Sequence, residues 1–246
     1  MAPNRLAVAS AALLAFLSLC SSSLAQDQYF LYLRWPGGLC SKGDCCFHST
    51  YPRQNDFVVH YLARSFTGTF PQCNPNPFYA AALQNFIQDM YKYWPSLNCP
   101  AATGIKEWGD SWNDNGKCSG IDQPLYFQRA INLTKSANLL DKLATKGILP
   151  SKYNTYRLVD VMNAINEGLG ANTAVISCAS NSSSILRNVR LCIDPTASFP
   201  ADCIDKPPNR CAERVKLLPL AYNTLQQAAE DQEQENPIQM VTSPDM

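Results

Sequence analysis

Ten cysteines between residues 40 and 211 constrain the fold of this chain more than any other feature of its sequence. They follow residues 1–25, which combine a positive charge at Arg5, an apolar run from Ala11 to Leu19 and small residues before Gln26. This combination is typical of a secretory signal peptide, and no later apolar stretch is long enough to predict a membrane span in the mature protein. An exported chain with an even number of cysteines is expected to form disulfides, here up to five.

The cysteines and two of the asparagines indicate covalent modification rather than metal binding. A structural zinc site needs paired Cys-x-x-Cys intervals, and none of the intervals in this chain has that length. We therefore expect neither a metal nor another cofactor. Sequons at Asn132 and Asn181 are candidate glycosylation sites, because Asn-x-Ser/Thr is the acceptor sequence in exported proteins.

The hydrophobic pattern predicts a mixed α+β domain that ends at Cys211. Runs rich in aromatic and β-branched residues predict strands, and one of these runs, DFVVHYL, contains His60. Apolar residues that recur every three to four positions predict amphipathic helices. The expected strands are 29–35, 56–62, 173–179 and 184–194, and the expected helices are 78–94, 124–146 and 155–169.

The composition changes after Cys211. Residues 212–246 contain six acidic and two basic residues and include a glutamine-rich run, so we expect a disordered acidic tail with some helical tendency near 217–229. The domain before the tail, residues 26–211, carries 17 basic and 14 acidic residues. This balance gives no overall electrostatic footprint for nucleic acid.

The segment EWGDSWNDNGKCSG, residues 107–120, has the composition of a catalytic helix, although it lacks histidine. Together with RWPGGLC, the adjacent Cys45 and Cys46, DFVVH, TFPQC and YWPSLNCP, it resembles the ribonuclease T2 family, in particular the secreted plant S-like ribonucleases. The resemblance extends over nearly the whole mature chain to Cys211. It implies an antiparallel sheet with packed helices and a set of five disulfides: Cys40 with Cys45, Cys46 with Cys99, Cys73 with Cys118, Cys178 with Cys211, and Cys192 with Cys203.

Active members of that family turn the ribose 2′-hydroxyl of RNA on the adjacent phosphate and form a 2′,3′-cyclic phosphate. The reaction needs a base, an acid and cations beside the phosphorane, and histidine suits both proton transfers because its pKa lies near neutrality. The resemblance places His60 at the histidine of the strand motif F-x-I-H-G-L-W-P. In the helix motif W-x-H-E-W-x-K-H-G-T-C, the four catalytic positions are instead occupied by Asp110, Ser111, Asp114 and Asn115.

These substitutions predict a secreted ribonuclease-like protein that is catalytically inactive or strongly impaired, with a stress, defence or storage role and at most weak binding of RNA. One alternative is an active endoribonuclease that uses His60, and another is a protein-interaction role through the tail, whose partner the sequence does not identify. Glu107, Asp110 and Asp114 also suggest a glycosidase or calcium site, but those sites need opposed carboxylates or more oxygen ligands. The other histidine, His48, matches no catalytic position of the family.

Overall fold

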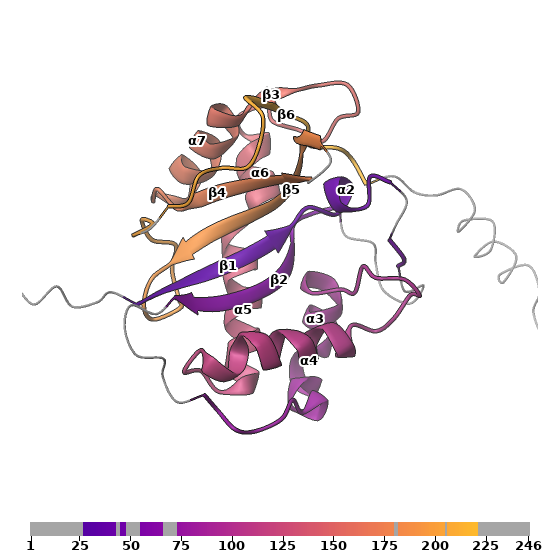
Figure 1. The fold of residues 1–246 in the computed structure, drawn as a ribbon, viewed down its shortest axis with the longest axis vertical. Helices are drawn as coiled ribbons and strands as arrows, with labels where there is room; N and C mark the ends of the chain where they lie inside the picture. The colour runs from indigo at the N-terminus through magenta and orange to yellow at the C-terminus, as the bar shows by residue number, and fades with distance from the viewer. Residues whose placement is uncertain are drawn as a thin grey trace, which may run out of the picture.

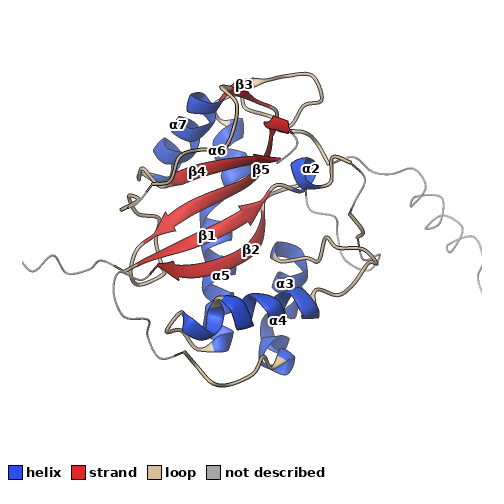
Figure 2. Ribbon diagram, in the orientation of Figure 1, coloured by secondary structure: helices blue, strands red, loops and turns tan. Residues whose placement is uncertain are grey.

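The computed structural model describes residues 27–42, 45–47, 55–65, 73–179, 182–204 and 206–220, apart from the side chains of residues 182 and 183. Its centre is a four-stranded antiparallel sheet with the strand order β2-β1-β5-β4 (Figure 1). All four predicted strands form this sheet, and their bounds are β1 (Gln28–Arg34), β2 (Val58–Ser65), β4 (Ala174–Ala179) and β5 (Ser182–Ile193). The predicted α+β class with an antiparallel sheet is therefore confirmed (Figure 2).

The alternation of residues along β1 gives the sheet two different faces. Leu31 and Leu33 are completely buried on one face, and helix α5 (Gln123–Ala137) crosses behind that face in Figure 1. Tyr32 and Arg34 are only partly buried and point to the opposite face, because successive side chains of a strand alternate. One face of the sheet thus forms the core, and the other carries aromatic and charged side chains.

One predicted helix, residues 124–146, is divided in two. Helix α5 ends at Ala137, and a second helix, α6 (Leu139–Ala144), begins after Asn138. Asn138 has φ 40° and ψ 55°, which lies in the left-handed region. Asparagine adopts this conformation more readily than most other residues with a side chain, so it can end one helix and begin the next.

The remaining helices differ from the predicted ranges at their first turns. Residues 78–94 form a 3₁₀ helix, η1 (Ala80–Phe86), and then α3 (Ile87–Tyr93), because Phe86 has φ −136° and interrupts the helical geometry. The third predicted helix begins at Leu158 as α7 (Leu158–Leu169) rather than at residue 155. The residues just before it, β3 (Tyr156–Arg157), pair with a strand near the end of the described chain instead.

The predicted boundary of the tail at Cys211 is wrong, because the fold continues to residue 220. The partner of β3 is β6 (Arg214–Val215), and Leu217 after it is 2% exposed. The indole Nε1 of Trp35 donates a hydrogen bond of 2.7 Å to the carbonyl of Leu218, which fixes this segment against α2 (Pro36–Leu39). Buried apolar residues and backbone pairing therefore extend the domain by nine residues, and residues 217–220 are not helical.

All five disulfides have the pairing that the resemblance implies. They join Cys40 to Cys45, Cys46 to Cys99, Cys73 to Cys118, Cys178 to Cys211, and Cys192 to Cys203. Three of them close loops of 33 to 53 residues. Cross-links over loops of this length restrict the unfolded chain and typically contribute about 2–4 kcal/mol each to stability.

Several predicted features lie outside the described residues. They are the signal peptide at 1–25, His48, the sequon at Asn181, and the tail from residue 221 onward. The other sequon residue, Asn132, is exposed on α5, so an attached glycan would project away from the core. Across the parts of the chain that the structure describes, no helix combines the length and apolar character needed to cross a bilayer.

Candidate functional site

A polar cleft of about 330 Å³ lies between the edge strand β2 and helix α4 (Ile105–Asp114). It brings His60 together with all four positions that the helix motif identifies. These positions lie about fifty residues after His60 in the sequence. The side chains that line it are Arg34, Val59, His60, Tyr61, Trp94, Pro95, Asn98, Glu107, Asp110, Ser111, Asp114 and Asn115. The candidate site predicted from sequence is therefore one continuous site in space.

His60 reaches the cleft because of an irregularity in β2. Tyr61 pairs with Tyr32 of β1, and Val59 pairs with Leu33, so His60 between them has no direct partner on β1. Such a β-bulge turns the side chain of the extra residue away from the regular alternation. With this bulge, His60 lines the cleft together with residues of α4.

Arg34 contacts the imidazole directly. Its Nη2 atom lies at hydrogen-bond distance from Nε2 of His60, and a guanidinium has only donors, so Nε2 is the acceptor. Burial and, to a smaller extent, the positive charge of Arg34 together lower the pKa of His60 from 6.5 to about 3. The neutral ring therefore carries its proton on Nδ1 and has its one lone pair directed at Arg34, which leaves no nitrogen free to accept a proton.

Helix α4 presents a buried apolar side and a polar side. Trp108 and Trp112 are completely buried, and their indole nitrogens donate to the carbonyls of Trp94 and Asn76 at 2.8 and 3.2 Å. The tryptophans therefore hold the helix against the core and are not available to stack on bases. The polar residues at the turns between them line the cleft.

Carboxylates dominate the α4 side of the cleft. Burial by itself would raise the pKa of Glu107, but hydrogen bonds from Ser96 Oγ at 2.6 Å and Asn98 Nδ2 at 2.8 Å outweigh this effect and lower it. Asp110 forms an exposed ion pair with Lys106 at 2.6 Å. Asp114 is the last residue of α4, where the partial negative charge of the helix dipole adds to that of the side chain.

Ser111 is held in the core rather than directed at a substrate. It is 7% exposed, and its hydroxyl lies 3.0 Å from the hydroxyl of Tyr126 on α5. Tyr126 in turn donates to the carbonyl of Leu62 at 2.9 Å. The position that carries glutamate in the family motif is therefore part of a buried hydrogen-bond chain between α4, α5 and β2.

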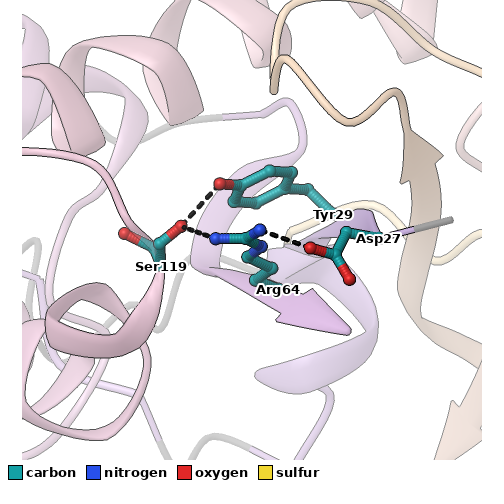
Figure 3. A network of polar contacts seen from close by, with 4 residues as sticks. All are labelled: Asp27, Tyr29, Arg64 and Ser119. Atoms are coloured by element: carbon teal, nitrogen blue, oxygen red, sulfur yellow. Dashed lines mark hydrogen bonds and ion pairs between the residues drawn. The ribbon is translucent and has the colours of Figure 1, made fainter. Parts of the chain in front are cut away.

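Arg64, at the proline position of the strand motif, is used for structure. Figure 3 shows its guanidinium between the carboxylate of Asp27, with which it forms an ion pair, and the carbonyl of Ser119 at 3.3 Å. The hydroxyl of Tyr29 donates to the same carbonyl at 2.5 Å. Gly120 has φ +77°, a left-handed conformation that favours glycine, and a β-carbon there would lie 2.8 Å from Nη1 of Arg64, so the guanidinium would have to shift.

Sequence reasoning did not identify Arg34 as a site residue. It lies in the predicted strand YFLYLRW, where an arginine among apolar residues is an available but weak signal. Its significance depends on the register of the sheet, because only the bulge in β2 places His60 beside it. Burial lowers the pKa of Arg34, and the nearby charge of Arg187 adds to this effect.

The disulfide-bonded α+β fold, with its cleft between an edge strand and a tryptophan-anchored helix, matches a known family of proteins. The model of the ribonuclease T2 family matches residues 26–203. Ribonuclease 3 of Arabidopsis thaliana is 36% identical over 215 residues, which cover 83% of this chain and 96% of the relative. The chain belongs to the ribonuclease T2 family.

Solved structures agree with this assignment. RNase NT, determined in complex with 5′-AMP, superposes with a TM-score of 0.72 at 30% identity and covers 79% of this chain and 98% of its own. The RNase-related protein from Calystegia sepium superposes with a TM-score of 0.63 at 25% identity, again over 79% of this chain and 98% of its own. The fold similarity thus extends over nearly the full length of both relatives.

Proposed function

We propose that this protein is an exported member of the ribonuclease T2 family whose catalytic cleft no longer cleaves RNA, or does so only very slowly. The observation that carries the proposal is the state of the histidine: Nε2 of His60 accepts a hydrogen bond from Arg34, and the second histidine position is Asn115. Transfer of the 2′-hydroxyl proton needs a base with a free lone pair, and departure of the leaving oxygen needs an acid. This cleft supplies neither group from the family's positions.

The missing proton transfers have a large expected effect on rate. Each general acid or base typically contributes about 100- to 10,000-fold. Asparagine at residue 115 neither gives nor takes a proton near neutral pH. Glu107 is a carboxylate that could in principle replace the missing acid. Its lowered pKa keeps it ionised, however, so it has no proton to donate to the leaving oxygen.

The charge of the cleft also disfavours the substrate. Asp114 replaces the lysine of the family motif, and a carboxylate about 5 Å from a phosphate in a medium of effective dielectric about 20 repels it by roughly 3 kcal/mol. A lysine at the same distance would attract the phosphate by a similar amount. Glu107 lines the same cleft and adds negative charge, whereas the charge of Asp110 is offset by its ion pair with Lys106.

Restoring the helix motif tests the proposal. We would combine Asp110→His, Asp114→Lys and Asn115→His, and leave Ser111 unchanged because Tyr126 occupies its surroundings. The variant is expected to release 2′,3′-cyclic phosphate from RNA, and a further Arg34→Gln change is expected to increase the rate by removing the positive charge that lowers the pKa of His60. The matched control carries the same changes with His60→Ala and should remain inactive. If the folded variant stays inactive even with Arg34→Gln, then the loss of activity is not explained by residues 34, 110, 114 and 115 alone.

The physiological part of the proposal is a role in stress response, defence or storage outside the cytosol. The location outside the cytosol is supported by the signal-peptide pattern at 1–25 and by five disulfides, which persist in oxidising compartments. A storage role predicts that the protein accumulates in one tissue and is degraded during regrowth, which quantitative immunoblotting of that tissue would measure. A constant, low abundance through regrowth would contradict storage.

A further inference from the structure

A second groove, of about 310 Å³, lies on the face of the sheet opposite α5. It adjoins the cleft at His60 and Tyr61 and extends across β1 and β5 to Ser177 on β4. Leu39 of α2 lines it as well. Neighbouring strands lie about 4.8 Å apart, so a groove over four strands is roughly 14 Å wide. It is large enough to hold a few residues of extended chain.

The lining of the groove is cationic, although the net charge of the whole chain is zero. Arg34, Arg187 and Arg190 all line it, and no carboxylate does among the residues described. Within this described part of the chain, none of the three arginines forms an ion pair. Guanidinium groups gathered on one surface repel one another, so the groove favours an anionic occupant.

The contacts of Arg190 fix its position but leave its charge uncompensated. Its guanidinium carbon lies 4.5 Å from the ring centroid of Phe30 and 5.9 Å from that of Tyr32. Nη1 donates to the hydroxyl of Tyr32 at 3.4 Å, whereas Nε and Nη2 have no hydrogen-bond partner among the described residues. Rings and a hydroxyl orient a guanidinium without neutralising it, and a carboxylate is the side-chain group that would neutralise it.

The described chain ends beside this groove. The carbonyl of Leu218 accepts its hydrogen bond from Trp35, the residue that precedes α2, and the end of the chain passes α2 in Figure 1. Leu220 is buried in a small apolar cluster, and Leu39, which lines the groove, packs against the same cluster. Residue 221 therefore leaves the domain next to the apolar cluster that borders the groove.

The chain beyond this point has the opposite charge. Residues 221–246 contain five acidic residues and no basic one, and four of the five lie within residues 230–235. A fully extended chain spans about 3.5 Å per residue, so the ten residues from 220 to 230 reach up to about 35 Å. This reach is more than twice the width of the groove, and the acidic run is therefore long enough to meet the arginines.

We propose that residues 230–235 of the same chain occupy this groove, with their carboxylates on Arg187 and Arg190. A weak contact is sufficient, because a short tether gives an effective concentration of about 1 mM, and a contact with a Kd of about 0.1 mM would then be closed in roughly 90% of molecules. The docked segment covers the sheet-side approach to His60, which both hollows share. The inference goes beyond the proposed function and does not depend on whether the cleft cleaves RNA.

A zero-length cross-link tests the contact in the full mature chain. Arg187→Lys keeps the charge and supplies an amine, and a water-soluble carbodiimide joins that amine to a carboxylate in contact with it, forming an amide while the carbodiimide becomes a urea. Trypsin then releases residues 217–246 as one peptide, because no lysine or arginine follows Lys216. We expect this peptide to be joined to residue 187 through residues 230–235, with at least about tenfold the yield of any link from Lys117.

Lys117 is the matched control for this experiment. It is partly buried, like Arg187, and it lies in η2 (Gly116–Cys118), at the end of β1 opposite to Arg34. The ion pair of Lys135 with Asp89, at 2.8 Å, shows that coupling has occurred. A mixture of unlabelled and nitrogen-15-labelled protein identifies links between two molecules by their mixed masses. The proposal is overturned if the Lys135 link forms without the link from residue 187, if Lys117 links to the tail equally well, or if the tail links join two molecules.

Protection from a glutamate-specific protease measures the same contact by its effect on the tail. Cleavage within 230–235 should be at least about threefold slower in the wild type than in Arg187→Gln, and the difference should disappear in roughly 1 M salt, where charges more than about 3 Å apart are screened. Lys117→Gln should be cleaved at the wild-type rate. A synthetic peptide of residues 221–246 corrects for the effect of salt on the protease.

A variant of the tail guards against misfolding of the groove. Asp231→Asn combined with Glu233→Gln leaves the domain unaltered and keeps two cleavable glutamates, at 230 and 235. Because it removes two of the four carboxylates, it should be cleaved faster than the wild type, as Arg187→Gln is. Equal cleavage rates for the wild type, Arg187→Gln and this tail variant at low salt would overturn the proposal, and so would a Lys117→Gln protein cleaved as fast as Arg187→Gln.

Discussion

Replacing Arg34 by glutamine should raise the pKa of His60, because the guanidinium both repels the imidazolium and occupies Nε2. The pKa in the folded protein is about 3, against an ordinary value of 6.5, and burial is the larger of the two causes. The arginine therefore accounts for less than half of the lowering, so the pKa of His60 in the variant should rise above 3 but stay well below 6.5. At pH 5 the protonated fraction of His60 should be about 1% in the wild type and measurably larger in the variant.

The measurement is an NMR titration of the imidazole signals between pH 3 and 8. The chain has only two histidines, His48 and His60. The signal that disappears in His60→Gln is therefore that of His60, and the signal that remains is that of His48. Arg34→Lys keeps a positive charge at the same position and should leave the titration of His60 close to that of the wild type. A His60 that titrates near 6.5 in the wild type, or that does not move in Arg34→Gln, would refute the argument that Arg34 and burial keep this base neutral.

Two further predictions concern stability. Unfolded chains protonate His60 below about pH 6.5, whereas the folded protein resists protonation until about pH 3, so the free energy of unfolding should fall by roughly 2 kcal/mol between pH 6.5 and 4.5 through this residue. Urea denaturation at both pH values should show that loss in wild type but not in His60→Gln, and an equal loss in both proteins would argue against it. Ser111→Glu should destabilise the fold by ~2 kcal/mol or more, because the larger charged side chain displaces the hydroxyl of Tyr126. Ser111→Ala, which loses only one hydrogen bond, should cost about 1 kcal/mol, and equal denaturation midpoints for the two variants would contradict the packing argument.

The sequence predicted the features that depend on local pattern or on the spacing of motifs. Residues 29–35 are rich in aromatic and aliphatic side chains, which predicts a strand, and they form β1. The cysteines within the family motifs imply five pairs, and the fold brings each pair together. The positions counted back from Cys118 also proved to line one cleft with His60. The strands are predicted correctly because they need only a period along the chain, whereas the disulfide pairing and the cleft positions were implied by the resemblance to the ribonuclease T2 family.

The features that the sequence did not predict depend on tertiary contacts. The helix breaks at Asn138 because of the left-handed backbone conformation there, and α7 begins only at Leu158 because the residues before it pair with β6. The apolar pattern of the sequence continues through both places and does not indicate either feature. The domain boundary was set too early at Cys211 because the acidic composition further along obscured Val215 and Leu217, which are buried. The contact between Arg34 and His60 depends on a bulge in a strand 26 residues away, and no local pattern indicates it.

The central claim, that the cleft no longer performs the family's reaction, is tested most directly by RNA cleavage. Purified, disulfide-bonded protein is incubated with yeast RNA between pH 4 and 8, and acid-soluble fragments are compared with those from His60→Ala. We expect the two proteins to be indistinguishable, because His60 has no free lone pair and residue 115 is asparagine. Release of 2′,3′-cyclic phosphate products by the wild type, well above the His60→Ala control, would contradict the claim.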